Sequence, residues 1–331
     1  MNEVRAVVVR EFGEPDSVAV ENVPEPQAAA GEVIIDVAFA ALNFPDLLVV
    51  RGTYQSLPDL PFVPGKEAAG TVTDVGADVD PSWLGRRVIA MVDHGAFAQR
   101  IRVSASVLVA IPDTMSFENA AAFGLVYRTA YFGLVRRARL QAGETVLVTG
   151  VGGGAGSAAA ALSKALGARV IAVVPDDMRA AVARDQGADE VIVLQRESIR
   201  ERVRDLTGGR GVDVVYDVVG DAVLGEAIRA TAFEGRVVVI GFAGGEPAAI
   251  KPGHLLVKNI AVIGSVSGEY RDRMPDVMTA AMDELLTLAA GDHLPIPVDS
   301  VFALEDAPEG FARVQKGKVL GKVLLAIGAP A

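Results

Sequence analysis

A glycine-rich turn between an apolar strand and an alanine-rich helix constrains the fold of this chain more than any other feature. Residues 145–174 read TVLVTGVGGGAGSAAAALSKALGARVIAVV, which predicts a strand, a turn with five glycines between Gly150 and Gly156, a helix and a second strand. This order of elements is the unit that binds a dinucleotide in doubly wound α/β proteins. The sequence therefore predicts a dinucleotide-binding domain, and a turn of purely structural use is the alternative.

The glycines of this turn have different expected tasks. Gly150, Gly153 and Gly156 recur every three residues, a variant of the dinucleotide fingerprint. We expect Gly150 to allow the tight turn, Gly153 to let the backbone approach a pyrophosphate, and Gly156 to let the helix pack against the strand. The rest of the expected phosphate-binding turn consists of Gly152, Gly154 and Ala155. A triphosphate-binding P-loop is disfavoured, because no Gly-Lys-Ser/Thr follows.

The end of the second strand bears on which dinucleotide is bound. An NAD site usually has an acidic residue there that accepts hydrogen bonds from the ribose, whereas this chain has Val174. Arg179 follows shortly and could pair with a 2′-phosphate, so the sequence favours NADPH over NADH. Asp176 and Asp177 leave NADH open, because either carboxylate could bind a ribose. The alternative for them is a capping turn before the next helix.

Apolar strands alternate with helical segments through the middle of the chain. These strands are short, rich in Val and Ile, and lack polar alternation, which indicates a parallel, doubly wound sheet covered by helices on both faces. The predicted strands are Val146–Thr149, Val170–Val174, Glu190–Leu194, Val212–Tyr216, Arg236–Ile240 and Ile260–Ile263. Predicted helices between them include Ser157–Leu166, Met178–Gln186 and Ala222–Thr231.

The two ends of the chain differ from the middle. The N-terminal part consists of short β segments separated by Pro and Gly, which predicts a mainly antiparallel, barrel-like unit. The C-terminal part has a strand at Val298–Phe302, a helix at Ala307–Val314 and a strand at Lys322–Ile327, too little for a sheet of its own. We therefore expect it to fold back onto the N-terminal unit.

Composition argues against several classes of function. Acidic residues outnumber basic ones by 42 to 31, and the net charge of −11 disfavours nucleic acid or an anionic membrane as the main partner. The chain has no cysteine, which removes disulfides, thiolate zinc sites and cysteine nucleophiles. The segment MNEVRAVVVREFG has too short an apolar run for a secretory signal, so we expect a cytoplasmic location. His94, His254 and His293 share no ligand spacing, which indicates surface or loop positions.

Nine stretches along the chain resemble the zinc-independent quinone oxidoreductases of the medium-chain dehydrogenase/reductase superfamily, the group that includes zeta-crystallin. They are residues 7–15, 41–54 (ALNFPDLLVVRGTY), 60–72 (LPFVPGKEAAGTV), 120–131, 140–156, 216–220 (YDVVG), 236–245, 255–265 and 321–325. The resemblance implies an α/β protein in which a Rossmann doubly wound parallel sheet is inserted into a GroES-like β-barrel catalytic domain. It assigns residues 1–121 and 285–331 to the catalytic domain and 122–284 to the Rossmann domain.

The resemblance also implies that no catalytic zinc is bound. Zinc-dependent relatives hold their metal with a cysteine where this chain has Asn43, a histidine where it has Lys66, and a cysteine near Leu125, while Glu67 is retained. A catalytic zinc needs three suitable protein ligands. Without this Lewis acid the acceptor must spread the incoming negative charge itself, as quinones and α,β-unsaturated carbonyls do. Lys66 could contact an anionic substrate, and a solvated lysine or one paired with Glu67 is the alternative.

The same resemblance assigns site residues. It places Asn43, Asp46 and Tyr54 in the catalytic-domain wall near the nicotinamide, with Tyr54 as a hydrogen-bond donor to the substrate oxygen and Asn43 as a polar orienter. The alternatives are that Asn43 caps a turn and that Tyr54 is a half-buried barrel tyrosine. Further expected cofactor contacts are Tyr127, Thr129, Gly241, Phe242, Ala243 and Lys322.

These inferences predict an NADPH-dependent reductase of quinones or related conjugated carbonyls, an activity of the EC 1.6.5 type. Two alternatives stay open: an enoyl-thioester or 2-alkenal reductase of the EC 1.3.1 type, and a non-catalytic NADPH-binding protein. The strand at Ile260–Ile263 is expected at the edge of the sheet, where it could pair with its twin in a second subunit. A homodimer through residues 260–264 is therefore predicted.

Overall fold

The computed structural model describes residues 2–245, 247, 249–291 and 294–328. The chain forms two compact units, the first ending at Leu125 and resuming at Val298, the second comprising residues 126–297. The first change of unit falls inside α2 (Phe117–Tyr131). Of the boundaries predicted from sequence, 121/122 lies in the same helix, whereas 284/285 lies inside α9 (Pro275–Ala289).

The first unit is built on a seven-stranded sheet in the order β14-β15-β3-β4-β5-β7, with β6 also paired to β3, within the described residues. β15 runs antiparallel to β3, with Val323 opposite Leu42, so the C-terminal part does fold back onto the N-terminal unit. The strands are β1 (Glu3–Val8), β2 (Ala19–Pro24), β3 (Glu32–Leu42), β4 (Glu67–Val75), β5 (Arg87–Met91), β6 (Arg100–Ser104), β7 (Leu108–Ala110), β14 (Val298–Ala303) and β15 (Lys322–Ala326). The helices are α1 (Phe44–Val50) and α10 (Ala307–Gln315), with 3₁₀ turns at Pro15–Ser17, Pro81–Trp83, Ala105–Val107 and Leu304–Asp306.

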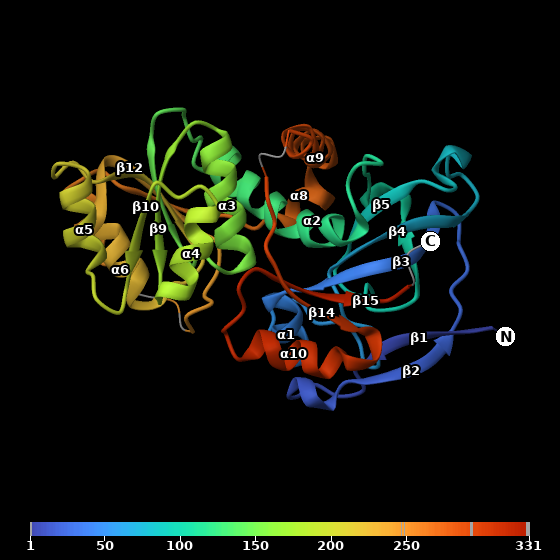
Figure 1. Cartoon of the computed structure of the whole chain (residues 1–331). Coiled ribbons are helices and arrows are strands. Elements are labelled where there is room, and N and C mark those ends of the chain that lie inside the picture. The colour runs from blue at the N-terminus through green and yellow to red at the C-terminus, as the bar shows by residue number, and fades with distance from the viewer. Residues whose placement is uncertain (1, 246, 248, 292–293, 329–331) are drawn as a thin grey trace. The chain divides into compact units, whose positions relative to one another are not determined.

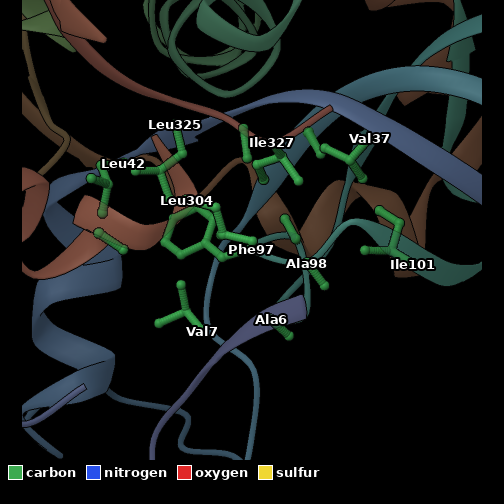
Figure 2. Close-up of a cluster of buried hydrophobic side chains, with 14 of the residues drawn as sticks. Ala6, Val7, Val37, Leu42, Phe97, Ala98, Ile101, Leu304, Leu325 and Ile327 are labelled. Carbon is green, nitrogen blue, oxygen red and sulfur yellow. The ribbon is translucent and has the colours of Figure 1, made fainter. Parts of the chain in front are cut away.

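Residues from both chain ends share the hydrophobic core of the first unit. Figure 2 shows Val7 and Phe97 packed in the same cluster as Leu304 and Leu325, and all of these side chains are buried. Burial of this apolar area, not any covalent link, holds the C-terminal strands in place.

The second unit contains a six-stranded parallel sheet in the order β10-β9-β8-β11-β12-β13 among the described residues. All six strands predicted from sequence are confirmed, and helices cover both faces, with α3 and α4 on one side and α5 and α6 on the other (Figure 1). The strands are β8 (Thr145–Thr149), β9 (Arg169–Val174), β10 (Glu190–Val193), β11 (Val212–Asp217), β12 (Thr231–Val239) and β13 (Ala261–Gly264). After α2 and a π-helical segment (Phe132–Arg137), the helices are α3 (Gly154–Ala165), α4 (Asp177–Asp185), α5 (Ile199–Leu206), α6 (Asp221–Ala230), α7 (Pro252–Leu256), α8 (Gly268–Arg273) and α9.

The strand order reverses between β8 and β11, and this reversal decides where a ligand can bind. In open α/β sheets, the loops after the carboxyl ends of the two strands at such a switch point diverge and leave a binding crevice. The glycine-rich turn follows β8, and the YDVVG segment ends β11. The fold therefore brings two of the sequence motifs to the same edge of the sheet.

Candidate active site

The glycine-rich turn has the backbone that the sequence predicts at its first and last glycines. Gly150 has φ +70° and Gly152 has φ +102°, a region that side chains disfavour. A Cβ on Gly156 would collide with the Gly150 carbonyl oxygen, so the last glycine lets α3 pack against the turn. Gly153, the N-cap of α3, has an ordinary φ of −94°, and a Cβ there would lie 3.6 Å from its nearest neighbour. The fold alone therefore does not require glycine at position 153.

The geometry of this turn fits the pyrophosphate of a dinucleotide. The first turn of α3 starts at Gly154, so the N–H groups of its first residues have no acceptor within the helix. These groups and the positive end of the helix dipole form an anion-binding surface. The hydroxyl of Ser157 accepts a hydrogen bond from the Gly152 N–H (3.1 Å), which holds the turn in place. The open space at Gly153 is what a closely approaching phosphate needs.

Arg179 lies directly against the glycine-rich turn. A Cβ on Gly152 would be only 2.7 Å from the Arg179 Cγ, so the stem of the arginine occupies the space that this glycine leaves open. Its guanidinium forms an ion pair with Asp176, and the Asp176 carboxylate also accepts a hydrogen bond from the Arg179 N–H (3.0 Å) as the N-cap of α4. The capping alternative for Asp176 is therefore confirmed. Val174 ends β9 and is fully buried.

A buried Thr149–Asp217 pair joins the ends of β8 and β11, and our sequence analysis did not single it out. The Thr149 hydroxyl donates to Asp217 (2.6 Å) and accepts from the Val218 N–H, while the Gly220 N–H donates to the other carboxylate oxygen. Burial raises the pKa of Asp217, and these hydrogen bonds oppose that rise. The signal in the sequence was an aspartate that ends an otherwise apolar strand. The pair fixes the spacing of the two loops at the switch point.

The other predicted cofactor contacts of the second unit lie in different surroundings. Tyr127 is fully buried, and its hydroxyl donates to the Pro295 carbonyl (2.6 Å); burial raises its pKa far above the usual tyrosine value. Thr129 lies within hydrogen-bonding distance of the Ser267 hydroxyl (3.2 Å). Gly241, Phe242 and Ala243 form the loop after β12, where the Ala243 N–H bonds to the Val218 carbonyl next to the glycine-rich turn.

In the first unit, Asn43 and Lys322 belong to one buried polar cluster. The Lys322 ammonium donates to Glu67 Oε1 (2.7 Å) and to Asn43 Oδ1 (2.5 Å). The Asn43 amide donates to the same Glu67 oxygen (3.1 Å) and to the Ala41 carbonyl, and Glu67 Oε2 accepts from the Leu125 N–H. The Lys322 side chain is 3% exposed and that of Glu67 is fully buried. In this structure Lys322 is therefore the buried counter-ion of Glu67.

Asp46 lies inside the wall of the first unit rather than on its surface. Its carboxylate accepts a hydrogen bond from the Asn43 N–H (2.8 Å) at the start of α1, so Asn43 does cap this helix. Burial raises the pKa of Asp46 to about 7, while the Asn43 N–H and the ammonium groups of Lys66 and Lys322 act in the opposite direction. Asp46 therefore supports the start of α1 through Asn43.

We expect Asp46→Asn to flatten the pH dependence of stability. The folded-state pKa of Asp46 lies above the ordinary aspartate value, so its contribution is complete below about pH 4 and is lost as the pH rises through about 7. Three pKa units correspond to about 4 kcal/mol, which the wild-type chain loses over this range and the variant does not. Denaturant unfolding at a series of pH values measures this difference. Parallel curves for the two proteins would contradict the assignment.

Lys66 and Tyr54 form a second pair in the first unit. The Lys66 ammonium donates to the Asp93 carbonyl (2.9 Å) and lies 4.6 Å from the centroid of the Tyr54 ring, a cation–π arrangement. Lys66 is only 8% exposed, so the expectation of a solvated lysine is wrong. Tyr54 is half-buried and packs against the core of the unit, as its alternative describes.

The residues at the positions of the zinc ligands do not fit a metal. Asn43, Lys66 and Leu125 offer an amide already used by Glu67 and Lys322, an ammonium and an aliphatic side chain. Across the described residues, no group of three or more His, Asp or Glu side chains could hold an ion. His94 lies in an exposed loop and His254 in α7, while His293 lies outside the described residues.

Comparison with known proteins identifies the family. The model "Alcohol dehydrogenase GroES-like domain" matches residues 29–113, and the model "Zinc-binding dehydrogenase" matches residues 154–284. Quinone oxidoreductase-like protein 2 of Rattus norvegicus is 36% identical over 324 residues, covering 98% of this chain and 92% of the relative. The chain belongs to the quinone oxidoreductase-like group of the medium-chain dehydrogenase/reductase superfamily.

Two further proteins that are similar to this quinone oxidoreductase-like chain are a reductase of a coenzyme A thioester and a protein solved with NADPH. Acryloyl-coenzyme A reductase of Metallosphaera sedula is 32% identical over 352 aligned positions, covering 97% of this chain and 99% of the relative. The solved structure of mycobacterial Rv1454c complexed with NADPH is 29% identical, has a TM-score of 0.90, and covers 97% of this chain and 99% of that one. The first unit of our structure is thus the GroES-like domain and the second the Rossmann-like domain. No helix in the described part of the chain has the length and apolar character needed to cross a bilayer.

Proposed function

We propose that this oxidoreductase uses NADPH to reduce a quinone or a related conjugated carbonyl, without zinc. The observation that carries the proposal is a pairing of two features. The dinucleotide turn has its packing glycine at 156 and an arginine against Gly152, whereas the metal positions 43, 66 and 125 hold no metal ligand. When bound, the reduced nicotinamide supplies a hydride. The acceptor delocalises the resulting charge over its conjugated system, which a saturated ketone cannot do.

The residues of this chain would divide the remaining work. The N–H groups at the start of α3 would bind the pyrophosphate, and Arg179 would bind the 2′-phosphate, while Gly241, Phe242 and Ala243 lie near the glycine-rich turn in the loop after β12. In the GroES-like domain, Tyr54 would donate a hydrogen bond to the acceptor oxygen. Asn43, fixed by Lys322 and Glu67, would hold the start of α1 in place.

An acyl-thioester acceptor is the second candidate. The acryloyl-coenzyme A reductase of Metallosphaera sedula aligns over nearly its whole length, and an enoyl thioester delocalises charge onto its carbonyl oxygen as an enone does. Both candidates need the same hydride and the same stabilisation of an oxyanion. They differ in the size of the acceptor, because an acyl thioester is attached to coenzyme A and a quinone is not.

A panel assay tests the proposal. Oxidation of NADPH is followed with a benzoquinone, a 2-alkenal, acryloyl-coenzyme A and a saturated ketone, and each is repeated with NADH. We expect turnover with the quinone and none with the saturated ketone. Turnover restricted to acryloyl-coenzyme A would support the second candidate. NADPH binding without oxidation by any acceptor would indicate a non-catalytic NADPH-binding protein.

Arg179→Met tests the basis of the proposed preference for NADPH. The methionine keeps the apolar stem against Gly152 but removes the guanidinium, and charge-assisted bonds to a phosphate are among the strongest hydrogen bonds. We expect NADPH to bind roughly 10- to 100-fold more weakly, with NADH binding nearly unchanged. Titration calorimetry with both cofactors measures this. Equal weakening for both would mean that Arg179 supports the turn and does not select the phosphate.

We also propose that the chain forms a homodimer through β13. This strand lies at the edge of the parallel sheet, and Leu256, which ends α7, and Val257, which follows it, are 78% and 74% exposed. An apolar edge strand favours pairing with a second copy. Light scattering should give twice the mass of the chain, and Val257→Glu should lower it. A monomer at micromolar concentration would contradict the proposal.

A further inference from the structure

A cavity of about 550 Å³ in the second unit, which we call the arginine cavity, has a wall composed mostly of arginines. This volume is typical of sites that hold a small molecule. Of the described residues, those that line it are Arg136, Arg137, Ala138, Arg139, Arg236 and Ile263, and none of these is acidic. Because the whole chain carries a net charge of −11, this wall is a local exception to its charge.

Two of the four arginines are held in place by hydrogen bonds. Arg236 forms a bidentate pair with Glu144, with both contacts at 2.8 Å, and its Nε donates to the Ala138 carbonyl (3.0 Å). The Nε of Arg137 donates to the carbonyl of Gly264 (3.0 Å), which is a neutral acceptor. Among the contacts that the structure describes, one carboxylate therefore faces four guanidinium groups.

The other two arginines, Arg136 and Arg139, have no side-chain hydrogen bond or ion pair within the described part of the chain. The backbone of Arg139 has φ +53°, a left-handed conformation that is uncommon for a residue other than glycine. Its carbonyl accepts hydrogen bonds from the side chains of Arg236 (3.4 Å) and Gln141 (2.9 Å), which hold this backbone in place. A guanidinium group is a planar fork that matches the oxygens of a phosphate. Two such forks are thus available to a ligand.

A second cavity, of about 410 Å³, shares Arg136 and Arg139 with the first. Most of its other lining residues are apolar and belong to the π-helical segment and to α9, and we call this space the apolar hollow. They are Val135, Val277, Ala280 and Ala281, together with Tyr131 and Asp276. The Asp276 carboxylate repels an anion from this side. The charged end of a ligand therefore belongs with the arginines, and its apolar end belongs against α9.

The arginine cavity is separate from the expected site of the dinucleotide phosphates. Its residue Ile263 lies on β13, which is separated from β8 by the two strands β11 and β12. Arg236 lies in register with Val214, and Val214 with Val146 near the start of β8, whereas the glycine-rich turn follows the end of β8. The pyrophosphate of a bound dinucleotide therefore leaves these arginines unused.

We propose that the arginine cavity and the apolar hollow form a second binding site, for a small organic phosphate with an apolar portion. The phosphate oxygens accept hydrogen bonds from Arg136, Arg137 and Arg139, and the apolar portion packs against Val277 and Ala280. Three guanidinium groups without a carboxylate partner among the described residues favour a phosphate dianion over a singly charged carboxylate. This site goes beyond the proposed reductase function, because its ligand takes no part in hydride transfer.

The test is titration calorimetry on protein saturated with NADPH, so that the dinucleotide site is already filled. The probes are hexyl phosphate, which has an apolar portion, and inorganic phosphate, which has none. We expect hexyl phosphate to bind more tightly than inorganic phosphate, and binding to weaken as salt is added, because these arginines are exposed. The double variant Arg136→Gln/Arg139→Gln should weaken the binding of hexyl phosphate roughly 10- to 100-fold.

Two further variants make the comparison specific. Arg204→Gln, which removes a 72% exposed arginine from α5, should leave both affinities unchanged. Ala280→Trp fills the apolar hollow from an exposed position on α9, so it should weaken hexyl phosphate and leave inorganic phosphate unchanged. Light scattering checks that the proteins compared have equal mass, because Ile263 belongs to β13, the strand of the proposed dimer.

Equal affinity of the wild type and the double arginine variant for hexyl phosphate would overturn the proposal, and so would the absence of binding by either probe. The arginines would then only complement the dipole at the end of a helix. If inorganic phosphate binds as tightly as hexyl phosphate and Ala280→Trp changes neither affinity, the apolar part of the proposal is wrong. None of these measurements depends on turnover, so failure of the proposed reductase function would leave them unaffected.

Discussion

Lys322→Met is expected to lower the free energy of unfolding by about 3–5 kcal/mol, the cost of leaving a buried carboxylate without its counter-ion. The ammonium of Lys322 is bonded to Glu67 and Asn43 in a buried site, where solvent would not take its place as a partner of the carboxylate. A loss of this size is a large part of the stability of an ordinary domain. Denaturant unfolding, followed by a probe in the GroES-like domain such as the single tryptophan, Trp83, measures it.

Two further variants test whether the loss of stability comes from the unpaired carboxylate of Glu67 or from the loss of a lysine side chain as such. Lys318→Met removes an exposed lysine from the turn before β15 and should change the unfolding free energy by less than about 0.5 kcal/mol. The double variant Lys322→Met/Glu67→Gln removes both charges and should recover most of the loss, because the penalty comes from the unpaired carboxylate. If the double variant is as unstable as the sum of the single ones, the ion pair is not the cause.

Gly153→Ala and Gly156→Ala are expected to fail in different ways. A Cβ at position 156 meets the backbone of Gly150, so this variant should unfold at lower denaturant even without cofactor. A Cβ at position 153 meets only ordinary contacts, so this variant should be as stable as the wild type. It should nevertheless bind NADPH at least roughly 100-fold more weakly, because the methyl group would occupy the space of the pyrophosphate, and this factor corresponds to about 2.7 kcal/mol.

Measuring stability and NADPH affinity in both variants makes the comparison informative. Gly225→Ala in α6 provides a matched control, since a Cβ there would contact only the far end of an arginine side chain at 3.9 Å, and it should leave binding unchanged. If Gly153→Ala binds NADPH as tightly as the wild type, the pyrophosphate does not lie against this glycine.

The parallel sheet of this chain was predictable because its pattern is local. Each strand of the second unit is a short Val- and Ile-rich run, and the helices between them have their own periodicity. The glycine-rich turn was equally readable, since φ values of +70° and +102° at Gly150 and Gly152 leave few residues other than glycine. The return of the C-terminal part to the first unit followed from the absence of a sheet for it to join.

Contacts between distant positions were not predictable in the same way. Nothing in the neighbourhood of Lys322 indicates that its ammonium reaches Glu67, 255 positions away, because the pairing depends on how β15 and β4 each lie beside β3. The Thr149–Asp217 pair likewise depends on two parallel strands becoming neighbours. A solvated position, one of the alternatives for Lys66, was wrong because a flexible charged side chain is usually exposed, and only the fold shows that the Tyr54 ring and the Asp93 carbonyl lie against this one.

The antiparallel pairing of β15 with β3 has a consequence for the order in which the protein matures. A ribosome synthesises residues 126–297 before Val323–Ala326, so the nucleotide-binding unit has its complete sequence while the other unit still lacks a strand. Until translation passes Lys322, the nascent polypeptide contains Glu67 without its cationic partner and part of a core without its last apolar residues. Chaperones that bind this protein during synthesis should therefore stay bound longest to the N-terminal part of the first unit, and not to residues 126–297.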